Sequence, residues 1–159
     1  MILLKGIRFR TFKAQDVSTI HSLIIETITV CYSSFPPTYR QHWIEDHYST
    51  ERIMADASEG YTLVIEHHGN IIGIGNLLQD EIQSVFIYPD YQQQELGTQL
   101  MMRLEEHAKQ QSIREIELFA LTPSRSFFKQ LGYHTRSEHQ FKDPHLSHFK
   151  YYIMRKRIE

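Results

Sequence analysis

The chain has 159 residues, of which 41% are hydrophobic and 23% charged, with a formal net charge of -2 and an isoelectric point near 6.5. The length suits one domain over residues 1–159, and the charge gives no electrostatic reason to expect nucleic acid or a membrane surface as a partner. The single cysteine, Cys31, excludes an internal disulfide framework and fits a reducing compartment, so we expect a cytoplasmic protein.

The first part of the chain predicts one strand and three helices. Residues 7–10 are a short strand candidate, and Asp16 is placed to cap a helix. The apolar stripe of that helix recurs at three- and four-residue spacing: Val17, Ile20, Ile24 and Ile28. After the break at "SSFPPT", residues 39–48 and 50–57 predict two short helices.

The middle of the chain changes from helical to strand periodicity. The stretch "YTLVIEHHGNIIGIGNLL" (61–78) contains two β-rich runs around a His-Gly-Asn turn, which predicts a hairpin. A third strand follows at 82–88. The next segment, 95–110, predicts a helix because Leu96, Leu100 and Leu104 form one apolar stripe.

The last part completes a fold with more strands than helices. Residues 113–121 predict a strand, and 123–133 a helix with proline in its first turn and Gly132 at its end. Two further strands are expected at 134–141 and 148–156. A strand-helix-strand crossover among hairpin-connected strands indicates an α/β fold with a sheet of mixed direction.

Two local patterns, in this order, resemble those of the GNAT superfamily of N-acetyltransferases. The stretch "VFIYPDYQQQELGTQLM" (85–101) is similar to the acetyl-CoA signature, a strand followed by Pro-x-Tyr-Gln/Arg-x-x-Gly-x-Gly and a helix. The stretch "SFFKQLGY" (126–133) is similar to a later helix that usually reads Phe-Tyr-x-x-Leu-Gly-Phe. The resemblance covers nearly all of the chain, and it implies a mixed, mostly antiparallel twisted sheet of about six to seven strands with helices on both faces.

This resemblance implies that the chain binds acetyl-CoA. The pyrophosphate would lie against backbone N–H groups at the start of the helix, where hydrogen bonds and the helix dipole favour an anion. The pantetheine arm would run along one strand backbone like an added strand. The implied cofactor-binding residues are Phe86, Ile87, Gln92, Gln93, Gln94, Glu95, Leu96, Gly97 and Thr98.

The chain departs from the signature at two loop positions. Glu95 stands where the family has a glycine, and Gln93 replaces a second frequent one. A carboxylate near a helix N-terminus stabilises the helix but repels a phosphate. Two interpretations stay open: either the Glu95 side chain points to solvent and only its N–H faces the ligand, or the cofactor site is weakened or lost.

The resemblance also suggests a general base. Glu81 lies eleven positions before Gln92, the spacing at which lysine-acetylating members of the family carry a catalytic glutamate. A carboxylate at the start of a sheet strand is expected to be partly desolvated, which makes it a better proton acceptor. The alternative is a solvated turn residue after Asp80.

A general acid is harder to find. Phe128 occupies the place of the tyrosine that many family members carry, and Ser124, Ser126 and Tyr133 are the nearby hydroxyls. A thiol with a pKa of about 8.5 leaves readily, so water can protonate it. We expect N-acetylation of a primary amine, in a small molecule or a peptide, by direct attack without a covalent enzyme intermediate. The alternative is a degenerate module that binds acyl-CoA or a protein partner.

The resemblance implies that the acceptor lies against the first two helices and their loop, at about residues 31–48, with the last strands on the other wall. Tyr32, Tyr39 and Trp43 are candidate substrate-binding residues, and Glu45 and Asp46 would attract a cationic amine. The alternative is that these aromatic side chains anchor the short helices on the sheet. The sequence identifies no particular substrate, and it leaves a homodimer open.

Ten histidines raise the question of a metal site. His145 and His148, and the pair His67–His68, lack a carboxylate or cysteine at a spacing that would complete a ligand set. We therefore expect surface histidines and no bound metal.

Overall fold

The structure, a computed structural model, describes residues 4–159 and contains one seven-stranded sheet in the order β1-β2-β3-β4-β5-β7-β6. The strands are β1 (Ile7–Thr11), β2 (Tyr61–His67), β3 (Asn70–Leu78), β4 (Glu81–Ile87), β5 (Glu115–Leu121), β6 (His134–Gln140) and β7 (Lys150–Arg157). Every neighbouring pair is antiparallel except β4 and β5. The prediction of a mixed, mostly antiparallel sheet is confirmed.

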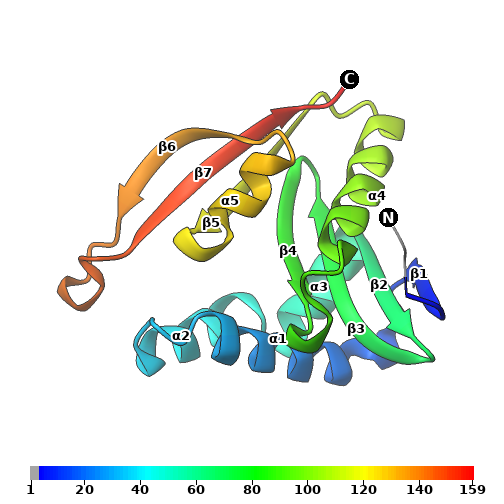
Figure 1. Cartoon of the computed structure of the whole chain (residues 1–159), viewed down its shortest axis with the longest axis horizontal. Helices are drawn as coiled ribbons and strands as arrows, with labels where there is room; N and C mark the ends of the chain where they lie inside the picture. Colours follow the sequence, from blue (N-terminus) through cyan, green and yellow to red (C-terminus); the bar gives the residue numbers. More distant parts are fainter. Residues whose placement is uncertain (1–3) are drawn as a thin grey trace.

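Helices cover both faces of this sheet, as predicted (Figure 1). They are α1 (Val17–Cys31), α2 (Pro37–His47), α3 (Thr50–Glu59), α4 (Leu96–Gln110) and α5 (Thr122–Gln130). The predicted stripe of α4, which comprises Leu96, Leu100 and Leu104, is buried against the sheet. Each fully buried leucine contributes roughly 1.5–3 kcal/mol, which is enough to fix the position of this helix.

The two layers are separate clusters. The stripe of α4 shares its cluster with Phe128 of α5, whereas the stripe of α1 packs with Val64, Ile74 and Phe86 on the other face of the sheet. Val64, Ile74 and Phe86 lie side by side across β2, β3 and β4, because the antiparallel registers pair them. Because side chains alternate between the two faces of a strand, each of these strands contributes one set of side chains to the face covered by α4 and another set to the face covered by α1.

Strands β4 and β5 diverge after a short contact. Glu81 pairs with Glu117 and Ile82 with Leu118, and no later pair joins the two strands in the part of the chain that the structure describes. From there β5 leads into a ribbon of β7 and β6 that runs away from β4 (Figure 1). The sheet is consequently open in its middle, between the carboxyl ends of two parallel strands.

The prediction that Asp16 caps α1 is confirmed for its position, but its side chain makes no capping hydrogen bond to that helix. Asp16 precedes α1, but its backbone is already helical (φ -78°, ψ -15°) because a short 3-10 turn over Ala14–Asp16 leads into the helix. Its carboxylate instead accepts hydrogen bonds from the Arg10 guanidinium, at 2.8 and 2.9 Å, and from the Lys13 N–H, at 2.8 Å. The Arg10 bonds lower the pKa of Asp16 and fasten β1 to the start of α1.

Candidate active site

A cavity of about 1350 Å³ occupies the opening between β4 and β5. Its walls come from β4, the loop before α4, the end of β5, the first turns of α5, and the end of α1 with α2. All of the predicted site residues line it except Gln94. The fold therefore brings together the predicted cofactor-binding residues, the candidate base and the candidate substrate-binding residues, which were predicted from separate parts of the sequence.

The N-terminus of α4 forms the mouth of this cavity. The first residues of the helix are Leu96, Gly97 and Thr98, and all of them line the cavity. As in any helix, the N–H groups of this first turn have no acceptor within the helix. A Cβ on Gly97 would lie 3.1 Å from Cζ of Phe127 on α5, so a larger residue here would require the Phe127 ring to shift. This end of α4 can hold an anion through hydrogen bonds and the positive end of the helix dipole.

The loop before α4 keeps a glycine-like backbone without glycine. Gln93 and Glu95 have φ angles of 65° and 62°, in the left-handed region that costs other residues about 1–2 kcal/mol each. The helix begins at Leu96, one position after the predicted start at about Glu95, and Glu95 is its N-cap residue. Both side chains are exposed. The left-handed geometry explains why the family uses glycine at these positions.

Gln92 connects the loop to two other elements. Its side-chain Nε2 donates to the Ile87 carbonyl at 2.9 Å and to Sγ of Cys31, at the end of α1, at 3.3 Å. These bonds close the loop over the end of β4. The contribution of Cys31 was missed in the sequence, because its distance from Gln92 along the chain gives no signal of contact.

The free edge of β4 offers backbone groups to the cavity. The Tyr88 N–H donates to the Ile72 carbonyl of β3, and N–H directions alternate along a strand. The N–H of Phe86 therefore points toward β3, whereas those of Val85 and Ile87 point into the opening. Both predicted strand residues, Phe86 and Ile87, line the cavity, but only the N–H of Ile87 points into it. The N–H of Val85 was missed because the sequence does not tell which strand pairs with which edge.

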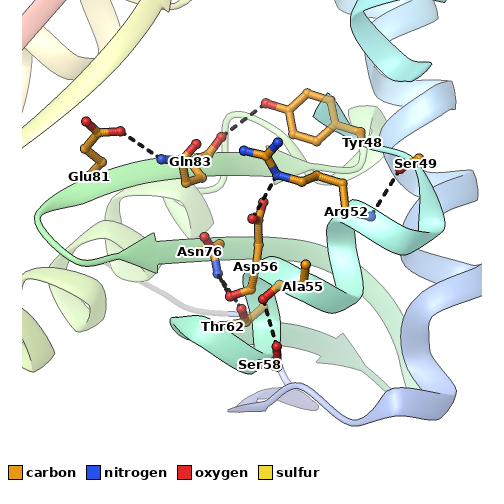
Figure 2. A network of polar contacts seen from close by, with 10 residues as sticks. All are labelled: Tyr48, Ser49, Arg52, Ala55, Asp56, Ser58, Thr62, Asn76, Glu81 and Gln83. Carbon is orange, nitrogen blue, oxygen red and sulfur yellow. Dashed lines mark hydrogen bonds and ion pairs between the residues drawn. The ribbon is translucent and has the colours of Figure 1, made fainter. Parts of the chain in front are cut away.

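A bulge interrupts β4 before this free edge. Asn76 of β3 pairs with Ser84, but the next residue, Leu77, pairs with Ile82, so Gln83 has no partner in the β3 register. The Gln83 carbonyl accepts a hydrogen bond from the Tyr48 hydroxyl at 3.1 Å, as Figure 2 shows. Bulges of this kind redirect one residue of a strand, here toward the helices that cover it.

The candidate base lies beside this bulge. The Glu81 carboxylate accepts a hydrogen bond from the Gln83 side-chain amide at 2.9 Å (Figure 2). Its parallel neighbour on β5, Glu117, is bound to Arg155 at 2.7 Å. The expected desolvation of Glu81 is wrong: its side chain is exposed, because the turn after β3 leaves the start of β4 open to solvent.

Aromatic rings form the wall opposite the sheet. Tyr32 contacts Trp43 edge to face, with 5.1 Å between the ring centroids. Tyr39 stacks on Trp43 and on Phe35, with centroid distances of 6.2 and 5.2 Å. These rings line the cavity and also pack helix α2 against its neighbours, so their anchoring role is confirmed, whereas their role in binding a substrate stays a prediction. Burial raises the pKa of Tyr39 to about 12 and also raises that of Tyr32, so both remain neutral phenols at pH 7.

Helix α5 itself contributes no tyrosine to the cavity. Phe128 is buried at the predicted place and carries no proton to donate. Tyr133 is fully buried just before β6 and donates to Glu105 at 2.9 Å, and it does not line the cavity. Ser124 and Ser126 do line the cavity, and the Ser124 hydroxyl donates to the Leu121 carbonyl at 3.1 Å.

Residues 4–159 contain neither a side-chain cluster suited to a metal ion nor a helix suited to cross a membrane. No three His, Cys, Asp or Glu side chains in this range are arranged to hold a metal ion. His67 instead lies 2.8 Å from the Tyr91 hydroxyl. Across the same range, each helix is too short or too polar to cross a membrane.

Comparison with known proteins gives one family. A family model described as "Acetyltransferase (GNAT) domain" matches residues 15–155. Among solved structures, a GCN5-related N-acetyltransferase from Rhodopseudomonas palustris has a TM-score of 0.85 at 18% identity, covering 99% of each chain. The PaiA N-acetyltransferase of Thermoplasma acidophilum, solved with coenzyme A, has a TM-score of 0.80 at 20% identity, covering 95% of this chain and 98% of that one.

A further similar structure is YncA of Salmonella typhimurium, a protein solved with acetyl-CoA. It has a TM-score of 0.75 at 14% identity, and the match covers 98% of this chain and 95% of that one. At these identities the three structures support the fold, and the family model carries the assignment to a family.

Proposed function

Because this chain belongs to the GNAT acetyltransferase family, we propose that it transfers the acetyl group of acetyl-CoA to a primary amine of a small molecule or a peptide. The observation that carries this proposal is the opening between β4 and β5 with the N-terminus of α4 at its mouth. An anion site and an unpaired strand edge in one cavity suit a long cofactor with a phosphate end and an amide-containing arm.

In this proposal the pyrophosphate of coenzyme A binds the N–H groups of Leu96, Gly97 and Thr98. The pantetheine arm adds to the free edge of β4, where Val85 and Ile87 offer backbone groups in an extended geometry. The thioester then lies deeper in the opening, toward the bulge at Gln83. Structures of PaiA with coenzyme A and YncA with acetyl-CoA, which share this fold, support the choice of cofactor.

The reaction is a direct displacement. The neutral nitrogen of the acceptor attacks the thioester carbon, a C–N bond forms, and the C–S bond breaks. The Val85 N–H stabilises the oxyanion, and the Glu81 carboxylate takes the proton that the nitrogen loses, directly or through one water. The thiolate of coenzyme A takes its proton from water, since Phe128 has none to give.

A second candidate function is an acyl-CoA-binding module without catalysis. Two observations favour it: Phe128 replaces the usual acid, and the Glu81 side chain is exposed rather than desolvated. Both functions predict cofactor binding, and they differ only in turnover.

Thiol release from acetyl-CoA across a panel of amines, with mass spectrometry of the products, separates the two functions. The proposal predicts amine-dependent release with one N-acetylated product for each thiol. Desulfo-CoA, which cannot donate an acetyl group, serves as the control for binding alone. Binding of acetyl-CoA and desulfo-CoA without turnover of any amine would favour the module.

A further inference from the structure

The carbonyl exposed by the bulge in β4 is held by one tyrosine. Tyr48, between α2 and α3, donates its hydroxyl proton to the Gln83 carbonyl, as Figure 2 shows. Its ring is held edge to face against Phe86, at 5.1 Å, and against Trp43, at 5.9 Å. The tyrosine is therefore fixed in one orientation, and it lines the cavity.

The same glutamine also holds the candidate base. The backbone carbonyl of Gln83 binds Tyr48, while its side-chain amide donates to the Glu81 carboxylate at 2.9 Å. Two oxygen-bearing groups are thus attached to one bulged residue at the inner end of the free β4 edge. That end is where the thioester lies if the chain functions as proposed above.

The hydrogen-bonding capacity left to Tyr48 is that of an acceptor. A phenol has one proton, and this proton is already committed to the Gln83 carbonyl. Burial raises the pKa of Tyr48 well above its usual value, so the hydroxyl stays protonated. What remains is lone-pair density on the oxygen, which can accept one N–H or O–H from a molecule in the cavity.

We propose that Tyr48 determines specificity for primary amines, by accepting one N–H of the acceptor nitrogen while the other hydrogen passes to Glu81 through one water. This inference rests on the proposed function and adds the acceptor contact. A neutral primary amine has two N–H groups, so it satisfies both partners, and the amide product still has one N–H for Tyr48. An alcohol or a secondary amine has a single hydrogen, which the reaction removes, so Tyr48 is left unmatched.

The test compares the best primary amine with its N-methyl derivative in the wild type, in Tyr48→Phe and in Tyr61→Phe. The wild type is expected to prefer the primary amine in kcat/KM, and Tyr48→Phe to reduce this preference roughly tenfold, the worth of one such hydrogen bond. Removing the Tyr48 hydroxyl also makes room for the methyl group, so the comparison of amide and ester inhibitors described next, in which no methyl group is added, decides whether the hydrogen bond sets the preference. Tyr61 lies on β2 against His107, away from the cavity-lining residues, so its variant should keep the preference.

A second measurement needs no variant, which matters if Tyr48→Phe folds poorly. The N-acetyl product and the matching O-acetyl ester are compared as inhibitors of the wild type. The amide, which has an N–H for Tyr48, should bind roughly tenfold more tightly than the ester, which has none.

Equal inhibition by amide and ester, or an unchanged amine preference in a folded Tyr48→Phe protein, would overturn the inference alone. Unchanged affinity for acetyl-CoA, measured by calorimetry, is expected in the folded variant, because Tyr48 contacts the acceptor and not the cofactor loop. If the wild type acetylates no amine at all, the proposed function and the inference both fail.

Discussion

Substitutions at Gln93 and Glu95 separate the effect of backbone strain on stability from the effect of charge on cofactor binding. Both residues hold φ angles above 60° in a loop where a glycine would carry no side-chain penalty. Replacing either residue by glycine removes about 1–2 kcal/mol of backbone strain from the folded state. The same change costs about 0.5–1 kcal/mol of stability, because glycine gives the unfolded chain more conformational freedom. We expect Gln93→Gly to stabilise the protein by about 1 kcal/mol, an increase in melting temperature of roughly 2–4 °C.

The carboxylate of Glu95 adds a second effect, on the cofactor. Its exposed side chain lies at the mouth where the pyrophosphate is expected, so Coulomb repulsion through water should weaken binding by a few-fold. Glu95→Gln removes the charge and keeps the strained backbone, whereas Glu95→Gly removes both. Both should lower the acetyl-CoA dissociation constant roughly two- to fivefold at low salt, and the gain should shrink toward 0.15 M salt because exposed charges are screened.

Isothermal titration at two salt concentrations and thermal melting measure the two effects independently. Glu95→Gly alone should show both the affinity gain and the stability gain, the latter reduced by the lost favourable contact between the carboxylate and the helix N-terminus. An affinity for Glu95→Gln equal to that of the wild type at low salt would refute the electrostatic reasoning. A lower melting temperature for Gln93→Gly would refute the strain reasoning.

Three further predictions concern the catalytic groups and the helix N-terminus. Glu81→Gln should lower kcat/KM about 100-fold near pH 7, which is the low end for a general base because Glu81 is exposed. The activity of the variant should recover as the pH approaches the pKa of the free amine. A pH profile identical to that of the wild type would exclude Glu81. Phe128→Tyr should leave acetyl-CoA affinity unchanged and raise kcat about tenfold in steady-state assays, and an unchanged kcat would show that thiolate protonation is not rate-limiting. Gly97→Ala should weaken acetyl-CoA binding about tenfold by calorimetry, because its Cβ would lie 3.1 Å from the facing ring on α5, and full affinity would show that the helix start tolerates the shift.

The order of elements could be read from the sequence because it depends on local periodicity. The leucines of the α4 stripe recur at helical spacing, and the two turn residues with positive φ, His68 and Gly69, are adjacent. Both patterns are short enough to be recognised in a single sequence. The helix boundary at Leu96 was missed by one residue, since a glutamate in left-handed conformation looks in sequence like the first residue of a helix.

The features that decide the chemistry could not be predicted in the same way. The choice of Val85 over Phe86 as the cavity-facing N–H depends on which strand pairs with β4, and the bulge at Gln83 appears only in the pairing register. The bond from Tyr48 joins residues 35 positions apart. Such contacts arise from tertiary packing, for which a single sequence carries no local pattern.

The central claim is that acetyl-CoA binds in the opening between β4 and β5 with its pyrophosphate at the start of α4. The most direct measurement is a calorimetric titration of the full chain with acetyl-CoA, at two temperatures and two salt concentrations. The account predicts one saturable site and, for Glu95→Gln, in which no carboxylate opposes the anion, an affinity that falls as salt rises because salt screens the helix dipole at an exposed site. No saturable binding up to millimolar acetyl-CoA at either temperature would contradict it.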